Sequence, residues 1–151
     1  MRHWDETWML VAQVMSRRSL CTRAQVGAVI VSADHRIVAT GYNGPPRGFN
    51  HMDAPCTSWC KRSAGNDPKA ADYSDCPSSH AESNAFMAAD RSAWQCGTLY
   101  VTGHVCAGCT KLIANSGIAR LVVQPDDQPR GYRESENSYQ FIRTMGIAVE
   151  F

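Results

Sequence analysis

The chain has 151 residues, a formal net charge of +1 and 44% apolar residues. This balance excludes a strongly basic nucleic-acid-binding protein and an acidic disordered tail, and we expect a single domain over residues 1–151. No apolar run approaches the ~18 residues of a membrane span and no signal-peptide pattern follows Met1, so we expect a cytoplasmic protein without membrane contact. The seven cysteines should then be reduced thiols or metal ligands rather than disulfides.

The first third of the chain predicts a helix followed by a β-hairpin. Asp5 is a candidate N-cap, and apolar residues then recur every three or four positions until about residues 17–19. Residues 25–31 and 37–42 are short apolar runs on either side of a polar turn, and they predict two antiparallel strands. The expected buried face of the helix consists of Trp4, Trp8, Val11, Ala12 and Met15.

Residues 43–79 are rich in glycine and proline and show no period. A long irregular segment inside a domain is usually functional or held by a ligand. Cys56, Cys60 and Cys76 lie in this segment, and two interpretations stay open. They either bind a second, structural zinc ion or pack as small apolar groups.

The second half of the chain alternates between helical and extended patterns. We predict helices over 79–89, 106–115 and 134–145, and strands over 98–102, 118–123 and 147–151. A strand–helix–strand order implies a right-handed parallel crossover. The fold class is therefore α/β, with a five-stranded mixed sheet and helices on both faces.

Two short motifs at the starts of predicted helices indicate the chemistry. Glu82 follows His80 by two positions, and Cys106 and Cys109 form a Cys-x-x-Cys pair. One imidazole and two thiolates are three zinc ligands, and a catalytic site leaves the fourth position to water. Zinc lowers the pKa of bound water toward ~7, and Glu82 is close enough in sequence to handle its proton. The alternative is a closed structural zinc site, with Glu82 as a solvated helix residue.

This combination is the signature of zinc nucleobase deaminases. From about Arg18 to Phe151 the chain resembles the deoxycytidylate (dCMP) deaminase branch of the cytidine deaminase-like family, through residues 21–31, 40–44, 80–85 and 98–102. The resemblance implies a three-layer α/β/α sandwich and hydrolytic deamination of dCMP to dUMP with ammonia release. It implies Zn²⁺ on His80, Cys106 and Cys109, with Glu82 as the proton-transferring catalytic residue.

The same resemblance implies the substrate contacts. Asn43 would hydrogen-bond the deoxyribose, Arg23 would meet the 5′-phosphate, and Tyr132-Arg133 is a candidate phosphate-binding pair. Ala81, between the zinc ligand and the catalytic carboxyl, completes the expected substrate-binding set.

Two positions depart from the family pattern. Val105 stands where the family usually has proline before the first cysteine, and Ser74 stands where this branch often has histidine. The alternatives are therefore deamination of dCTP, of a modified dCMP or of cytidine, or a non-catalytic nucleotide-binding module stabilised by zinc. The resemblance further implies a homo-oligomer, usually a hexamer, with dCTP and dTTP as effectors. The near-neutral charge argues against a long nucleic-acid ligand.

Overall fold

The computed structural model describes residues 3–46, 48–49, 76–124 and 135–151. Its sheet has the strand order β2-β1-β3-β4-β5. β1 pairs antiparallel with β2 and β3, whereas β4 pairs parallel with β3 and β5. The prediction of a five-stranded mixed sheet is therefore confirmed. The strands are β1 (Gly27–Val31), β2 (Ile37–Tyr42), β3 (Thr98–Val101), β4 (Arg120–Val123) and β5 (Ala148–Glu150).

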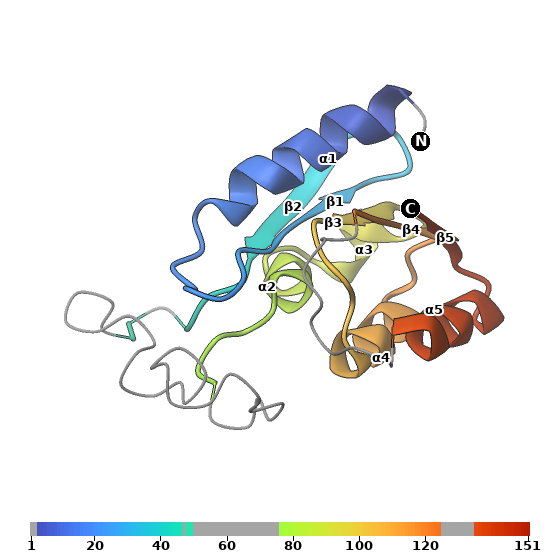
Figure 1. Ribbon diagram of the computed structural model, residues 1–151. Helices are drawn as coiled ribbons and strands as arrows, with labels where there is room; N and C mark the ends of the chain where they lie inside the picture. Colours follow the sequence, from blue (N-terminus) through green and yellow to red (C-terminus); the bar gives the residue numbers. More distant parts are fainter. Residues whose placement is uncertain (1–2, 47, 50–75, 125–134) are drawn as a thin grey trace.

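The helices cover both faces of this sheet. Figure 1 shows α1 on one face and α2, α4 and α5 on the other, which confirms the three-layer α/β/α arrangement. The short helix α3, which was not predicted, follows α2. None of the helices in the described segments is long and apolar enough to cross a bilayer. The helices are α1 (His3–Ser16), α2 (Ala81–Met87), α3 (Arg91–Trp94), α4 (Ala107–Ser116) and α5 (Ser135–Thr144).

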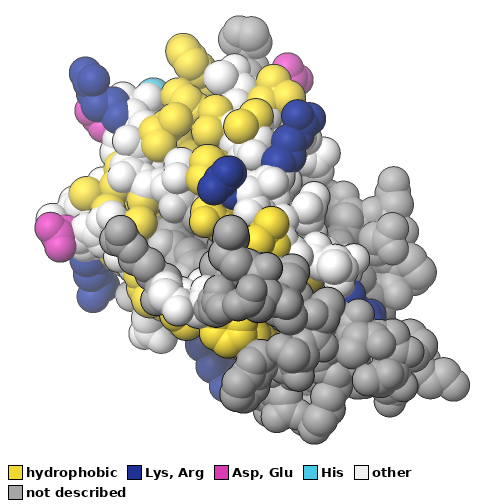
Figure 2. Space-filling model, turned by 90° about the vertical axis from the view of Figure 1, so that its left-hand side faces the viewer, with side chains coloured by type: hydrophobic (Ala, Val, Ile, Leu, Met, Phe, Trp, Pro, Cys, Tyr) yellow, Lys and Arg dark blue, Asp and Glu magenta, His cyan; other side chains and the backbone are white. Residues whose placement is uncertain are grey.

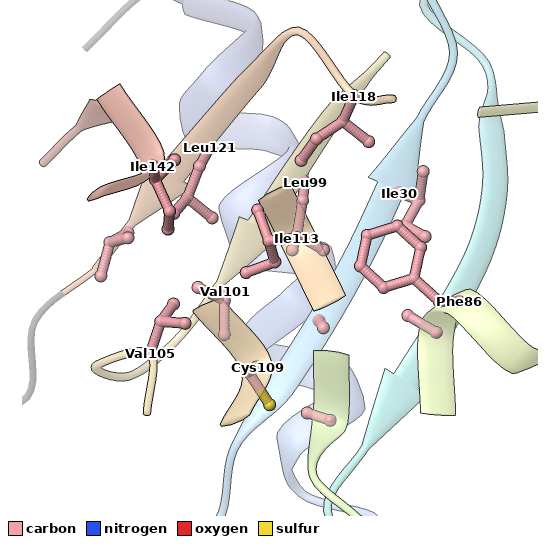
Figure 3. Packing of buried hydrophobic residues seen from close by; sticks show 14 of the residues in the cluster. Ile30, Phe86, Leu99, Val101, Val105, Cys109, Ile113, Ile118, Leu121 and Ile142 are labelled. Atoms are coloured by element: carbon pink, nitrogen blue, oxygen red, sulfur yellow. The ribbon is translucent and has the colours of Figure 1, made fainter. Parts of the chain in front are cut away.

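The interior strand β1, between β2 and β3, is buried on both faces, as its uninterrupted apolar run predicts. Because side chains alternate along a strand, Ile30 packs among α2 and α4, whereas Val29 and Val31 pack against α1. Full burial of one such side chain contributes about 1.5–3 kcal/mol. Figure 3 shows the larger of the two cores, with Leu99 beside Ile113 of α4 and Ile30 beside the ring of Phe86 of α2.

The predicted buried face of α1 is confirmed at Ala12 and partly at Trp8 and Val11, which pack against the core, and is wrong at Trp4. Asp5, Met9 and Ala12 are buried, whereas Trp4 is 53% exposed. Ala12 faces Gly27 so closely that a Cβ at Gly27 would lie 1.9 Å from the Ala12 carbonyl oxygen. This contact between small residues sets the rotation of α1 about its own axis. The large indoles of Trp4 and Trp8 lie to one side of the contact and stack on each other, with their ring centroids 5.4 Å apart.

Asp5 is an interior residue of α1 and not its N-cap. It accepts hydrogen bonds from Arg120 of β4 at 2.6 and 2.7 Å and from the hydroxyl of Tyr100 of β3 at 2.7 Å. Arg120 also pairs with Glu150 of β5 at 2.6 Å. This ion-pair network joins the first helix to the last three strands.

Candidate metal centre

The start of α2 holds the first candidate ligand. His80 has extended backbone and immediately precedes the helix. Ser79 forms a two-hydrogen-bond bridge with Gly44 just beyond β2, and the Asn84 side chain donates to the Tyr42 carbonyl at 2.7 Å. These contacts fix the first turn of α2 against the end of β2.

The absence of a side chain at Gly41 allows this contact. A Cβ there would lie 2.2 Å from the Ala81 carbonyl oxygen and 2.5 Å from the Ala85 nitrogen. The backbone of α2 therefore packs directly on β2, and the residues around Ala81 are placed by backbone contact rather than by an adjustable side chain.

The start of α4 holds the other two candidates. Cys106 is the N-cap of α4, and its sulfur accepts the Cys109 backbone N–H at 3.4 Å. The carbonyl of Cys106 accepts both the N–H and the hydroxyl of Thr110, which closes the first turn. Both sulfurs therefore lie at a helix N-terminus, where the dipole favours thiolate over thiol.

The donor atoms of His80, Cys106 and Cys109 lie within 4.8 Å of one another. The Nδ1 atom of His80 is 3.3 Å from the Cys106 sulfur and 3.5 Å from the Cys109 sulfur. Tetrahedral zinc with ordinary Zn–N and Zn–S bonds separates nitrogen from sulfur by about 3.6 Å, so these residues fit the ion. Among the described residues, the group that could hold this ion consists of His80, Cys106 and Cys109.

Glu82 lies in the first turn of α2 and is 3% exposed. Burial raises the pKa of its carboxyl above the ordinary value, and the opposing influence of His80 lowers it. Cys106 raises the same pKa through its charge, and a hydrogen bond from Cys109 lowers it, so the Glu82 carboxyl lies close to the candidate ligands. A buried carboxyl whose pKa is shifted toward neutrality can both accept and return a proton.

The two thiols are coupled to each other. Hydrogen bonding from Cys109, followed by that from His80, lowers the pKa of Cys106 to about 3, and the same contact raises the pKa of Cys109. The hydroxyl of Ser83 lies 3.9 Å from the Cys109 sulfur, a contact that the motif comparison did not identify. Without an ion, this environment therefore stabilises negative charge on the Cys106 sulfur and keeps the proton on Cys109.

Asn43 is buried just beyond the end of β2 and makes structural hydrogen bonds. Its side-chain oxygen accepts the Val26 N–H at 2.8 Å, and its side-chain nitrogen donates to the Ala24 carbonyl at 2.9 Å. Arg23 is exposed at the start of the segment that Asn43 holds, and Ala81 is fully buried. Asn43 therefore connects the end of β2 to the segment that contains Arg23.

Most of the remaining predicted site residues lie outside the part of the chain that the structure describes. Tyr132, Arg133, Cys56 and Cys60 lie outside the described residues. Cys76 is described and is partly buried. The expected phosphate pair and the expected second zinc site therefore stay predictions.

Three protein donors with a buried carboxyl beside them are typical of zinc enzymes that activate water. Comparison with known proteins identifies the family within this class of zinc enzymes. A family model described as "cytidine and deoxycytidylate deaminase zinc-binding region" matches residues 2–124. The chain belongs to this family, and zinc is its cofactor.

Among its relatives, the deoxycytidylate deaminase of Mycobacterium phage D29 is 43% identical over 123 residues, which are 79% of this chain and 92% of the relative. The deoxycytidylate deaminase of Saccharomyces cerevisiae is 35% identical over 147 residues, 97% of this chain but 44% of the yeast protein. The chain thus spans nearly all of the phage relative and less than half of the yeast one.

Solved structures show the same fold. The dCMP deaminase of cyanophage S-TIM5 in complex with dCMP and dUMP has a TM-score of 0.75 and 26% identity, and the match covers 99% of this chain and 98% of that one. Acinetobacter baumannii RibD has a TM-score of 0.65 and 25% identity, but the match covers only 34% of its length. The similarity to the cyanophage deaminase extends over the whole fold.

Proposed function

We propose that this chain deaminates dCMP to dUMP by hydrolysis, with release of ammonia. The observation on which the proposal chiefly depends is the convergence of His80, Cys106 and Cys109 within 4.8 Å, with buried Glu82 in the adjoining turn. The names of the relatives from phage D29 and yeast, and the nucleotides bound to the cyanophage protein, support dCMP as the substrate.

The roles of the residues follow from their places. His80, Cys106 and Cys109 would hold zinc, which supplies Lewis-acid activation of a water molecule at neutral pH. Glu82 accepts one proton from the attacking water as its oxygen bonds to C4 and delivers that proton to N3 of the cytosine; it then transfers the second proton of the same water to the departing amine. The carbon–nitrogen bond at C4 breaks, a carbonyl forms there and ammonia leaves. Because Glu82 is buried, bulk water does not compete for the proton that it transfers.

The sugar and phosphate contacts are proposed for residues other than the zinc ligands and Glu82. Asn43 holds the segment after Arg23, so binding of the 5′-phosphate by Arg23 and contact of Asn43 with the deoxyribose would act through one connected segment. Ala81 and the Tyr132-Arg133 pair complete the proposed substrate contacts. A phosphate needs one or two such cations rather than an extended basic surface.

The surface supports a small substrate over a long nucleic acid. On the face in Figure 2, the described Lys and Arg side chains are separated by apolar and neutral side chains rather than gathered in a track. The net charge of +1 agrees with this distribution. Tight binding of nucleic acid depends on several Lys or Arg contacts to successive phosphates.

The role of Glu82 is tested by Glu82→Gln, which keeps the shape of the side chain but removes its basic oxygen. The variant should retain zinc by elemental analysis, while kcat falls by about 10²- to 10⁴-fold. Glu136→Gln is the matched control, since Glu136 is an exposed glutamate on α5 that pairs with Arg143 at 3.4 Å. A Glu82→Gln protein that deaminates as fast as Glu136→Gln would refute the assignment.

The substrate is tested by ammonia release from dCMP, dCTP, cytidine and a short single-stranded oligonucleotide. We expect dCMP to have the highest kcat/KM, and Arg23→Gln to raise KM for dCMP while leaving the rate with cytidine unchanged. A preference for cytidine would remove the phosphate role of Arg23. Zinc without ammonia release from any of the four would support the non-catalytic nucleotide-binding module.

Four further expectations belong to the same proposal. A homo-oligomer, expected to be a hexamer, is tested by light scattering, and effector control by assays with added dCTP and dTTP. A second zinc on Cys56, Cys60 and Cys76 would give two zinc ions per chain. A reducing compartment such as the cytoplasm would keep the ligand thiols of Cys106 and Cys109 competent to bind metal.

A further inference from the structure

Tyr139 of α5 lies against the loop that leads from β3 to the zinc ligand Cys106. The side chain is 1% exposed, and its ring packs edge-on against Phe151 at 5.1 Å between centroids. A buried tyrosine hydroxyl needs a polar partner, because losing its hydrogen bonds to water costs free energy. The direction in which this hydroxyl points is therefore informative.

The hydroxyl contacts two consecutive residues of the loop. Its oxygen accepts the Val105 backbone N–H at 3.2 Å, and it lies 3.2 Å from Nδ1 of His104. Val105 is 2% exposed, so its N–H has no access to water and depends on this acceptor. In Figure 3, Val105 and Cys109 lie at the same end of the core, beyond Val101 at the end of β3.

Val105 immediately precedes Cys106, so its backbone sets where the ligand sulfur points. In the zinc deaminase signature, proline occupies this position. Proline restrains φ and has no N–H that needs a partner. Valine has neither property, so the loop must be held in another way, and the Tyr139 hydroxyl makes the contact that does so.

We propose that Tyr139 is a positioning residue for zinc: its hydroxyl, bonded to the Val105 N–H and to His104, fixes the backbone before Cys106 in place of a proline ring. The inference depends on the zinc site of the proposed function. Its test measures metal binding without substrate, so a failure here would leave deamination untouched, and a failure of the substrate assays would leave this inference untouched.

The first test compares two variants that each lose one buried hydroxyl. Tyr139→Phe removes the contact to the loop and keeps the ring. Tyr100→Phe is the matched control, because the Tyr100 hydroxyl is buried on the opposite face of the sheet and donates to Asp5 at 2.7 Å. Zinc affinity is measured by competition with a chromophoric chelator, below the unfolding temperature of each variant.

We expect the zinc Kd of Tyr139→Phe to rise about tenfold, the scale found for partners that orient metal ligands. Tyr100→Phe should lower Tm but leave the zinc Kd within about twofold of the parent protein. The visible absorption of the Co²⁺-loaded proteins should change in Tyr139→Phe and not in Tyr100→Phe. Equal zinc affinities for the two variants, or a Tyr139→Phe chain that does not fold, would overturn the proposal.

The second test is a double-mutant cycle with Val105→Pro. In the Val105→Pro background no N–H remains to be bonded, so adding Tyr139→Phe should change the zinc Kd by less than about twofold. A tenfold rise in both backgrounds would show that the Tyr139 hydroxyl acts through something other than the Val105 backbone, and it would contradict the proposal.

Discussion

Substituting Gly41 with alanine should damage the active centre without touching any proposed ligand. The added Cβ would lie 2.2 Å from the Ala81 carbonyl oxygen and 2.5 Å from the Ala85 nitrogen, both backbone atoms of α2. Non-bonded carbon contacts are comfortable at about 3.5–4.0 Å, so the helix must withdraw by about 1 Å or more.

This displacement acts on the chemistry because Ala81 lies between His80 and Glu82. A misplacement of about 1 Å costs on the order of 10²-fold in rate, which is the loss of kcat that we expect for Gly41→Ala. Overpacking of this kind also destabilises a protein by about 1–3 kcal/mol, or roughly 2–12 °C in Tm for a chain of this length.

The assay is ammonia release from dCMP, combined with zinc content and thermal unfolding of the same samples. Gly44→Ala is the matched control near the end of β2, since among the described residues a Cβ there would meet just the Tyr42 ring, at 3.4 Å. That variant should keep kcat within about threefold of the parent value. Equal rates for Gly41→Ala and Gly44→Ala would refute the reasoning that backbone contact with β2 places the start of α2.

Further predictions concern stability. Arg120→Met leaves the Asp5 carboxylate buried without its cation, which should lower the free energy of unfolding in urea by about 3–5 kcal/mol. The control is Arg36→Met, which removes an ion pair exposed to solvent and should leave Tm unchanged. Equal effects of the two substitutions would contradict this prediction. Burial, assisted by the hydrogen bond to Asp5, raises the pKa of Tyr100 above its ordinary value of 10.0, so its contribution to stability is complete below pH 10 and is lost as the pH rises further. Tyr100→Phe should therefore show a smaller loss of stability between pH 9 and about 11 than the parent protein. Removing zinc with a chelator should lower Tm and adding zinc should restore it, because the ion binds the folded chain; a Tm that does not respond would place the ion outside the folded core.

The fold was predictable because its elements depend on local patterns. Residues 27–31 form an uninterrupted apolar strand, and Gly117, with φ of 88°, ends α4 as a left-handed C-cap residue. The candidate zinc ligands were predictable for a similar reason, since each motif lies within one helical turn. The structure supplied only the fact that the two turns meet.

Contacts between distant segments were not predictable from such patterns. Asp5 was expected to cap a helix because its position before an apolar period is typical of a cap, and nothing nearby indicates that Arg120 is its partner. The same holds for Tyr139, which in sequence is one aromatic residue on an amphipathic helix. Trp4 was expected in the core because it falls on the apolar period of the helix, but the close approach of Ala12 to Gly27 decides which side of α1 is buried.

The most direct measurement is a crystal structure of the zinc-loaded protein, with anomalous diffraction collected at the zinc edge. Zinc should lie about 2.0–2.1 Å from Nδ1 of His80 and about 2.3 Å from the sulfurs of Cys106 and Cys109, with the fourth position open to solvent and the Glu82 carboxyl beside it. A fourth protein ligand on that ion, or a zinc peak only elsewhere in the chain, would contradict the account.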